Sequence, residues 1–413
     1  MTNNAAKALD TSSTPSIRFA TCSDIGLKRS INQDSYQHRV SSDKEWPQNG
    51  HLFIVADGMG AHAAGELASR LAADEVGKAS GSDDHNVCLV EAFHKANAVI
   101  HDQGQSNPQL YNMGTTCSAI WLLPTGALIG HVGDSRIYRV REQRIEQLTF
   151  DHSLVWEMRA AGQISGNNNS TIPRNVITRC LGPHAHVEID LEGPFEICEG
   201  DTFLLCSDGL TGRIEDSELG VAMHYLPPQE AAEFLVDLAN LRGGHDNITN
   251  TIIQIVGSEI ATGSGIAKSA SEPTGTHPAL WFLAGLGMVM TLAALAIRSI
   301  NLGAAGVVLF LIAALWIAMR FATTVPRLDK NGFAKLSPPY ARAATNISDD
   351  FLQGIVKTFE SSIDQARKTG EVDAVTLSAI ETDIDALPRS AEGVDPKSAF
   401  ERIRDIAQRL RSL

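Results

Sequence analysis

The sequence predicts a mixed α/β domain over residues 17–256, followed by two long apolar blocks and a helical C-terminal region. In the first zone, short runs rich in β-branched and aromatic residues alternate with clusters of turn residues and a few amphipathic stretches, a pattern typical of strands and helices that share one core. The two apolar blocks carry no charged residue, and the C-terminal region repeats apolar residues at three- and four-residue spacing. With 413 residues, the chain has room for one large domain with additions.

The overall charge and the cysteine pattern exclude some classes of protein. The formal net charge of -14 argues against nucleic acid as the main partner, because binding to a phosphate backbone needs a basic surface. The six cysteines include no Cys-x-x-Cys pair, which suits buried free thiols in a reducing compartment. Residues 1–16 are polar and lack the apolar core of a secretory signal, so we expect a flexible N-terminus and a first domain that stays in the cytoplasm.

Several runs in the first zone are predicted to be strands because they are short, apolar and bounded by turn residues. They read HLFIVA, CSAIWLL, ALIGHV, RIYRV, TFLLCS and TIIQIV. Amphipathic helices are predicted for the stretches GELASRLAADEVGKA, NVCLVEAFHKANAVIHDQ and PQEAAEFLVDLANLR. Residues 257–278 are rich in Gly, Ser, Thr and Pro without a hydrophobic period, and we interpret them as a flexible linker.

Residues 279–297 and 302–319 are the two uncharged apolar blocks. At about 1.5 Å per helical residue, each just spans the roughly 30 Å hydrocarbon core of a bilayer. Only the short turn RSIN separates them, so we expect a tight hairpin of two transmembrane helices. Basic residues follow the second block, against a single arginine in the turn, and this bias places both flanks in the cytoplasm. The alternative is a pair of buried helices in a soluble core.

Residues 328–413 form a last zone with two or three helical stretches. The segments DDFLQGIVKTFESSIDQARKTG and PKSAFERIRDIAQRLRSL place apolar residues on one face, with charges between them. We interpret this zone as a small helical bundle or a coiled-coil partner surface.

Four aspartates adjoin predicted strands and are bordered by Gly, Ser or another turn residue: Asp57, Asp134, Asp208 and Asp246. Small neighbours let the backbone bend sharply, so that carboxylates from distant segments can converge, although ordinary Asp-Gly turns are the alternative. Hard divalent cations such as Mg²⁺ or Mn²⁺ prefer oxygen ligands and keep several waters, so a few carboxylates suffice to hold them. Two such ions can activate a shared water and clamp a phosphoryl group for in-line attack. Arg29 is suited to bidentate capture of phosphate oxygens.

Eight blocks in unbroken order carry a resemblance to a known family. They read RSINQD, VADGMGAHAAGE, MGTTCSA, GHVGDSRIY, LTFDHSLVWEMRAAGQI, RNVITRCLG, LLCSDGLTG and HDNIT. Over residues 17–256 the chain strongly resembles the bacterial type-2C (PPM) metal-dependent serine/threonine protein phosphatases. The resemblance implies an α+β fold, a four-layer α-β-β-α sandwich with the metals at one end. The linker, the apolar hairpin and the C-terminal helical segment lie outside it.

The resemblance also implies which positions hold two core ions, Mg²⁺ or Mn²⁺. Asp57 would bridge both ions, and the carbonyl of Gly58 would add a ligand. Asp208 and Asp246 would bind the same pair.

Further positions follow from the same resemblance. Asp34 would touch the metal shell through water, and Asp134 would help to hold a third, weaker ion of the kind found in bacterial members. Arg29 would bind the substrate phosphate. Gln33 stands where many members have Glu, which removes a charge from the outer metal shell.

The sequence leaves two candidates for the general acid. Met59 follows Asp-Gly where animal members have a histidine, and His62 lies three residues further on, as in other bacterial members. Imidazole titrates near neutral pH, so His62 could protonate the departing seryl oxygen. A metal-bound water could serve instead, with His62 as a structural residue. Residues 151–180 resemble the family's flap, a variable loop that we expect to contact substrate.

Cysteine-based phosphatase chemistry does not fit the sequence. That mechanism needs an arginine six positions after the cysteine, whereas Arg29 and Arg213 each come one position too late after Cys22 and Cys206.

We therefore expect a membrane-anchored serine/threonine phosphatase of the cell inner membrane, with the phosphatase domain and the C-terminus in the cytoplasm. Its partners would be phosphorylated Ser/Thr proteins, a cognate Ser/Thr kinase and the lipid bilayer, with no nucleic acid. One alternative is a degenerate domain that only binds phosphoproteins, which the retention of Asp57, Asp208 and Asp246 disfavours. Another is that the hairpin and C-terminal helices sense or assemble, with the phosphatase as their output.

Overall fold

The fold is that of a computed structural model of the chain. The structure describes residues 8–13, 16–60, 63–80, 84–163, 173, 176–262, 327–328, 334–335, 338–370 and 372–413. The chain divides into two compact units. The first unit contains Met1–Gly265 and Ser337–Leu413, and the second contains Ile266–Leu336.

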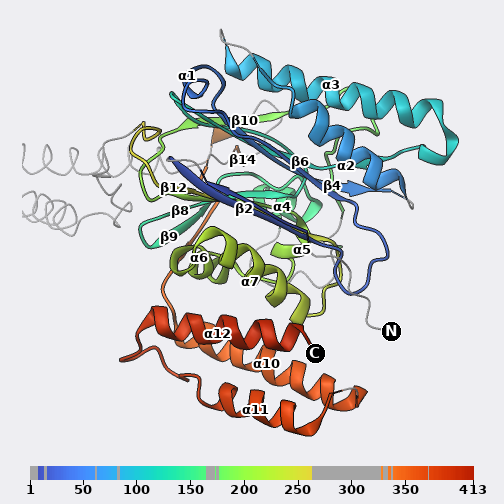
Figure 1. The fold of residues 1–413 in the computed structure, drawn as a ribbon. Coiled ribbons are helices and arrows are strands. Elements are labelled where there is room, and N and C mark those ends of the chain that lie inside the picture. The colour runs from blue at the N-terminus through green and yellow to red at the C-terminus, as the bar shows by residue number, and fades with distance from the viewer. Residues whose placement is uncertain are drawn as a thin grey trace, which may run out of the picture. The chain divides into compact units, whose positions relative to one another are not determined.

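Two antiparallel sheets form the centre of the first unit (Figure 1). The seven-stranded sheet has the order β1 (Ala8–Ser13), β2 (Ile17–Asp24), β12 (Ile248–Ile255), β11 (Thr202–Cys206), β8 (Arg136–Arg141), β9 (Arg144–Gln147) and β15 (Ala341–Ala344). The six-stranded sheet has the order β10 (Asp190–Phe195), β7 (Gly126–Val132), β6 (Cys117–Leu123), β4 (His51–Met59) and β3 (Asp34–Arg39), with the short β5 (Gly114–Thr115) beside β4.

Apolar side chains from both sheets share one buried cluster. Phe19 of β2 and Phe203 of β11 belong to the same cluster as Phe53 of β4 and Ile120 of β6. The rings of Phe19 and Phe53 meet edge to face, with their centroids 5.1 Å apart. Because successive strand residues point to opposite faces, the outer face of each sheet is left to pack on helices.

Helices cover both outer faces, so the predicted α-β-β-α layering is confirmed (Figure 1). On the six-stranded sheet lie α2 (Ala63–Val76) and α3 (His85–Ser106), whose Ala72 and Phe93 pack with Trp121 of β6. On the seven-stranded sheet lie α6 (Asp216–Tyr225) and α7 (Pro228–Leu241), whose Leu219 and Phe234 belong to a second core. Short helices complete the unit: α1 (Trp46–Asn49), η1 (Pro108–Leu110), α4 (Leu154–Ala160) and α5 (Asp208–Thr211).

Part of the N-terminal segment differs from the expectation of a flexible tail. Ala8–Ser13 forms β1, which pairs antiparallel with β2. A strand at the edge of a sheet presents unpaired N–H and C=O groups, and this segment satisfies those of β2.

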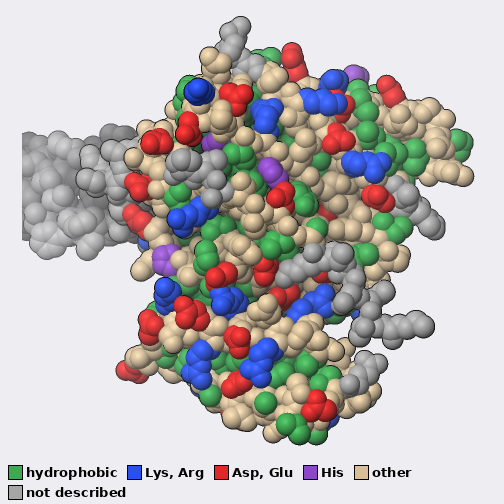
Figure 2. All heavy atoms as spheres, in the orientation of Figure 1, with side chains coloured by type: hydrophobic (Ala, Val, Ile, Leu, Met, Phe, Trp, Pro, Cys, Tyr) green, Lys and Arg blue, Asp and Glu red, His purple; other side chains and the backbone are tan. Residues whose placement is uncertain are grey.

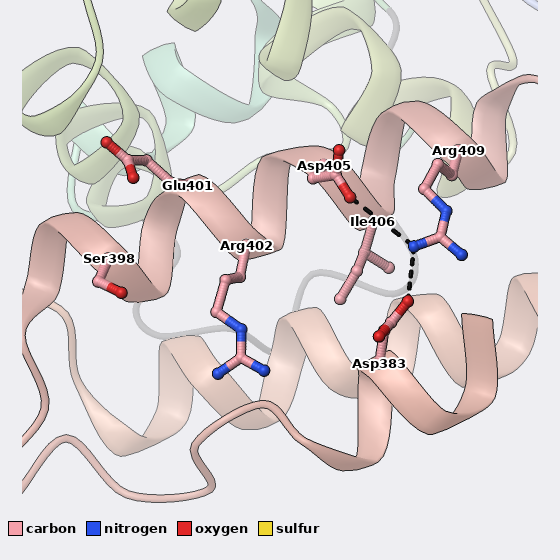
Figure 3. A pocket seen from close by; sticks show the side chains of 7 residues that line it. All are labelled: Asp383, Ser398, Glu401, Arg402, Asp405, Ile406 and Arg409. Atoms are coloured by element: carbon pink, nitrogen blue, oxygen red, sulfur yellow. Dashed lines mark hydrogen bonds and ion pairs between the residues drawn. The ribbon is translucent and has the colours of Figure 1, made fainter. Parts of the chain in front are cut away.

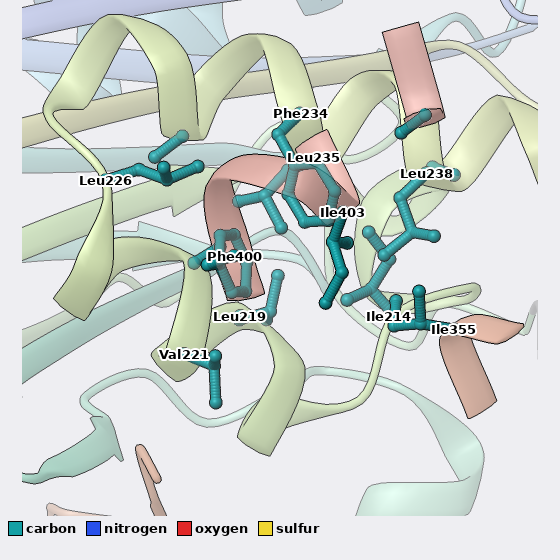
Figure 4. Packing of buried hydrophobic residues seen from close by; sticks show 14 of the residues in the cluster. Ile214, Leu219, Val221, Leu226, Phe234, Leu235, Leu238, Ile355, Phe400 and Ile403 are labelled. Atoms are coloured by element: carbon teal, nitrogen blue, oxygen red, sulfur yellow. The ribbon is translucent and has the colours of Figure 1, made fainter. Parts of the chain in front are cut away.

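The C-terminal region contains three helices, α10 (Asp349–Thr369), α11 (Ala374–Asp385) and α12 (Pro396–Arg411), here called the C-terminal bundle. Ser348 caps α10 by accepting a hydrogen bond from the Phe351 N–H (3.1 Å), and Gly370 ends the helix with φ +69°. The bundle packs on α6 and α7 in one continuous apolar core, in which Phe400 meets Phe234 (Figure 4). The sequence pattern predicted the helices but not this shared core.

In the second unit, the described residues are the short paired strands β13 (Arg327–Leu328) and β14 (Ala334–Lys335). The predicted transmembrane spans at 279–297 and 302–319 lie outside the residues that the structure describes. Among the helices it does describe, none combines the length and apolar character needed to cross a bilayer.

Candidate active site

Asp57 and Gly58 lie near the end of β4, where neighbouring strands fix the backbone. Asp57 is the cross-strand partner of Asp34, the first residue of β3. The Asp57 N–H donates to Thr116 Oγ1 (2.9 Å), and the Thr116 N–H donates to the Asp57 carbonyl (2.9 Å). A Cβ on Gly58 would overlap the carbonyl oxygen of Gly65, so only glycine fits there. These backbone contacts therefore fix the position of the Asp57 carboxylate.

Asp208 and Asp246 come from the seven-stranded sheet. Asp208 opens α5 directly after β11, and Asp246 lies in the turn before β12. A Cβ on Gly209 would overlap the carbonyl oxygen of Asn247, so a glycine is needed for the two turns to approach. Burial and the charge of Asp246 raise the pKa of Asp208, and the charge of Asp208 in turn acts on Asp57. Side chains from both sheets thus meet at one place.

Asn247 ties the loop between β2 and β3 to the Asp246 turn. Its Oδ1 accepts a hydrogen bond from the Gln33 N–H (2.8 Å), and its Nδ2 donates to the carbonyls of Ile25 (2.9 Å) and Ile31 (3.0 Å). Gln33 in turn donates from Nε2 to the Gly60 carbonyl (3.1 Å), after β4. The Gln33 side chain thus ties this loop to the end of β4.

Arg29 lies in the loop that Asn247 holds and reaches the carboxylates. Its Nη2 is 2.7 Å from Asp246 Oδ2, and its side chain is 47% exposed. The hydrogen bond to Asp246 raises the pKa of Arg29, and the charges of Asp57 and Asp208 add to this effect. A half-exposed guanidinium beside the carboxylates is well placed to receive phosphate oxygens.

The carboxylate cluster comprises Asp34, Asp57, Asp134, Asp208 and Asp246. Burial, followed by the negative charge of its neighbours, raises the pKa of Asp57 well above its ordinary value. The same two causes raise the pKa of Asp34 to about 7 and that of Asp134 to about 8. Carboxyl groups that disfavour one another's ionised form in this way need a positive charge nearby to be ionised at neutral pH.

The donor set fits hard divalent cations. Asp34 Oδ2 accepts a hydrogen bond from Ser207 Oγ (2.7 Å), whereas Asp34 Oδ1 and Asp134 Oδ1 are buried without a hydrogen-bond partner. Among the described residues, no group of three or more His, Cys, Asp and Glu side chains is arranged to hold a metal ion on its own. One oxygen of Asp246 is engaged by Arg29. Mg²⁺ in proteins is commonly held by one or two carboxylates and several waters, and carboxylate oxygens also suit Mn²⁺, so this set suffices.

Asp134 follows Gly133 after the end of β7, in a turn held against the Asp57 strand. Gly133 has φ +113°, and a Cβ there would crowd the side chain of Thr116. The hydroxyls of Thr116 and Ser135 are hydrogen-bonded at 2.6 Å. Thr116 therefore touches both the Asp57 and the Asp134 segments. Its only signal in the sequence was its place in the block MGTTCSA.

Two predicted parts of the site fall partly outside the described residues. His62 lies outside them, as do residues 164–172 and 174–175 of the flap segment. The base of the flap is described, and there Ser153 and Ile177 form an antiparallel bridge.

A separate pocket of about 370 Å³ lies in the C-terminal bundle, between α11 and α12 (Figure 3). Arg409 bridges its acidic side chains, at 2.6 Å from Asp383 and 3.7 Å from Asp405. None of the carboxylate cluster lines this pocket. On the face of the described residues that Figure 2 shows, acidic and basic side chains are interspersed.

Comparison with known proteins identifies the family. A family model described as protein phosphatase 2C matches residues 28–240. The chain is 38% identical over 245 residues to a putative protein phosphatase 2C-type of Streptococcus pyogenes, covering 57% of this chain and 97% of that protein. The crystal structure of the Mycobacterium tuberculosis serine/threonine phosphatase PstP/Ppp aligns with a TM-score of 0.52 at 33% identity, over 59% of this chain and 100% of that one.

A structure of the PstP catalytic domain in complex with two manganese ions aligns with a TM-score of 0.51 at 31% identity, over 60% of this chain and 100% of that one. The resemblance seen in the eight sequence blocks is thus confirmed for the first unit's sandwich. The chain belongs to the protein phosphatase 2C family, and its sandwich is a metal-dependent serine/threonine protein phosphatase domain.

Proposed function

We propose that this phosphatase hydrolyses phosphoserine and phosphothreonine in proteins at the carboxylate cluster. Two core ions, Mg²⁺ or Mn²⁺, would be held by Asp57, Asp208, Asp246 and the carbonyl of Gly58. The observation that carries the proposal is that buried carboxylates from both sheets converge and raise one another's pKa. Such a cluster is costly in a fold unless it binds cations.

The bound ions would supply Lewis acidity and a solvent nucleophile of lowered pKa. Asp57 and Asp208 would set the position of the pair, since Asp57 is held within β4 and Asp208 in the first turn of α5, which follows β11. Asp34, held by Ser207, would accept a hydrogen bond from the outer solvent shell. Asp134 would hold a third, weaker ion.

Arg29 would orient the substrate phosphate. In the structure its guanidinium pairs with Asp246, and five N–H donors leave capacity for two phosphate oxygens as well.

His62 is the proposed general acid, with solvent as the competing proton donor. A His62→Gln variant with a lowered kcat that is restored on substrates with a good leaving group would assign the role to His62, whereas unchanged kinetics would assign it to solvent.

The proposed chemistry is tested by Mn²⁺-dependent hydrolysis of a phosphothreonine peptide by the full chain. Asp57→Ala and Asp208→Ala should each lower kcat by roughly a hundredfold or more, because each removes a core ligand. Asp43→Ala, at an exposed aspartate between β3 and α1, is the matched control and should behave as the parent chain. Activity that survives both cluster substitutions would remove this assignment of the site.

We also propose that residues 279–297 and 302–319 tether the phosphatase to the inner membrane, with both flanks in the cytoplasm. The support is their uncharged sequence and the basic residues that follow. A tether would raise the local concentration of membrane-bound phosphoproteins, including the products of a cognate Ser/Thr kinase. The full chain should sediment with membranes and resist extraction by alkaline carbonate, while a chain without residues 279–319 should not. Extraction of the full chain by carbonate would contradict the tether.

A further inference from the structure

We propose that His152 is a positioning residue that couples the base of the flap to the turn carrying Asp134. This inference rests on the proposed function, because it assigns Asp134 to the weaker metal ion and the flap to the substrate protein. The His152 side chain is buried and would contact neither the weaker metal ion nor the substrate protein directly.

His152 and Gly133 bind each other through two hydrogen bonds. The His152 N–H donates to the Gly133 carbonyl (2.8 Å), and the Gly133 N–H donates to His152 Nδ1 (2.9 Å). Gly133 immediately precedes Asp134, so the imidazole helps to set the path of the chain that delivers this carboxylate. His152 is 1% exposed, and no solvent competes for these bonds.

The opposite edge of the ring faces a carboxylate. Because Nδ1 accepts a hydrogen bond, the neutral imidazole carries its proton on Nε2, which lies 3.0 Å from Asp190 Oδ2. The other oxygen of Asp190 accepts a hydrogen bond from Arg179 Nη1 (2.6 Å). A single line of hydrogen bonds thus runs from Gly133 through His152 and Asp190 to Arg179.

Arg179 belongs to the returning arm of the flap, which is attached to His152 a second time. The Thr178 N–H donates to the His152 carbonyl (2.9 Å), and the Leu154 N–H donates to the Val176 carbonyl (2.9 Å). His152 therefore lies where both arms of the flap meet the Asp134 turn. A displacement of the flap that moves Arg179 is transmitted to Gly133 through side chain and backbone together.

A second buried histidine holds the ring in place. His131 stacks on His152 with centroids 5.0 Å apart and an interplanar angle of 27°. His131 is itself fixed by Ser118 Oγ (2.9 Å) and by the Phe150 carbonyl (2.9 Å). Burial lowers the pKa of His131 to about 3, so this neighbour is neutral and does not compete for Asp190. The geometry leaves His152 one orientation.

The test uses the full chain in detergent and the variant Asp190→Asn, which keeps the shape of the side chain but removes its charge. The matched control is Asp201→Asn, because Asp201 precedes β11 in the other, seven-stranded sheet and binds Arg141 of β8 with contacts of 2.7 Å. Mn²⁺ binding is measured by calorimetry, and KM and kcat are measured with a phosphothreonine peptide and with p-nitrophenyl phosphate.

If His152 couples the two parts, Asp190→Asn should weaken the lowest-affinity Mn²⁺ site and raise KM for the peptide, each roughly threefold to thirtyfold. The two tighter Mn²⁺ sites and KM for p-nitrophenyl phosphate should stay within twofold of the parent. Asp201→Asn should lower only the melting temperature. A result in which Asp190→Asn also changes only the melting temperature, or affects all sites and substrates alike, overturns the proposal.

A double-mutant cycle with His152→Asn tests the coupling itself. The shorter side chain can still accept from the Gly133 N–H but cannot reach Asp190. Adding Asp190→Asn to His152→Asn should then have no further effect on Mn²⁺ binding. Additive effects would show that Asp190 acts by another route and would overturn the role of His152. If His152→Asn does not fold, the single variant Asp190→Asn and its control still decide.

Discussion

Replacing Phe400 with alanine should show that the C-terminal bundle is part of the phosphatase fold. Phe400 of α12 is fully buried. Its ring centroid lies 5.1 Å from that of Phe234 on α7 and 5.8 Å from that of Phe351 on α10. One side chain thus joins a helix of the sandwich to two helices of the bundle. A substitution that removes this contact should therefore destabilise both the sandwich and the C-terminal bundle.

The magnitude follows from the burial. Truncating a fully buried phenylalanine costs about 3–5 kcal/mol, from lost apolar transfer and the cavity left behind. The first unit has roughly 340 residues, so with an unfolding entropy of about 2 cal/mol/K per residue the melting temperature should fall by about 4–7 °C. The neighbouring contacts include Tyr225, with a centroid distance of 6.3 Å, which limits collapse of the cavity.

The assay is differential scanning calorimetry of the full chain, with loss of phosphatase activity followed at the same temperatures. We expect one main transition for the first unit, shifted in Phe400→Ala, with activity lost at the shifted temperature. Val375→Ala on α11 is the control, because Val375 is 79% exposed and its truncation should change stability by less than about 0.5 kcal/mol. Activity that persists at the parent's temperature while a separate bundle transition moves would refute the shared core.

Three further predictions concern the site. Gly209→Ala should abolish phosphatase activity, because the new methyl group would overlap the Asn247 carbonyl and separate the turns that carry Asp208 and Asp246. A phosphopeptide assay beside a circular dichroism spectrum checks this. Arg29→Lys should raise KM for a phosphopeptide about tenfold, since an ammonium cannot bind two phosphate oxygens as a fork does, and steady-state kinetics measure it. The pKa values of Asp34 and Asp134 are raised to about 7 and about 8, so both carboxyl groups bind protons more tightly in the folded state than in the unfolded state. In the metal-free protein, this tighter proton binding stabilises the fold at low pH, and the stabilisation is lost as the pH rises through 7 to 8. The melting temperature in EDTA should therefore fall between pH 6 and pH 8.5, Asp34→Asn should flatten this dependence, and Mn²⁺ should stabilise the protein most at the higher pH.

Much of the site could be predicted because its residues occur in short motifs with a local physical reason. Asp57 and Asp208 follow apolar strands and precede glycine, and the structure places both at strand ends with no room for a Cβ on the following residue. The alternation of apolar runs and helical stretches likewise predicted β4, β6, β7, β8, β11 and β12 and the helices α2, α3 and α7, but not β2, β3, β9, β10 or α6. A local sequence pattern is enough to predict a residue's role where that role depends only on the strand beside the residue.

Residues whose role depends on a distant partner were not predicted individually. Asn247, Thr116 and His152 each bind backbone groups from other segments of the chain. The sequence around each residue does not show which segment it will contact. The strand Ala341–Ala344 reads ARAA, which carries no β-propensity signal, and it forms because it completes the exposed edge of β9. The apolar faces of the C-terminal helices showed that they are buried, but not that they pack on α7.

The most direct test of the carboxylate cluster is a crystal grown with MnCl₂ and measured at the manganese absorption edge. We expect two anomalous peaks within ligand distance of the Asp57 carboxylate, with Asp208 and Asp246 among their ligands, and a weaker peak near Asp134. Manganese bound elsewhere in the same crystal, with no peak beside Asp57, would contradict it.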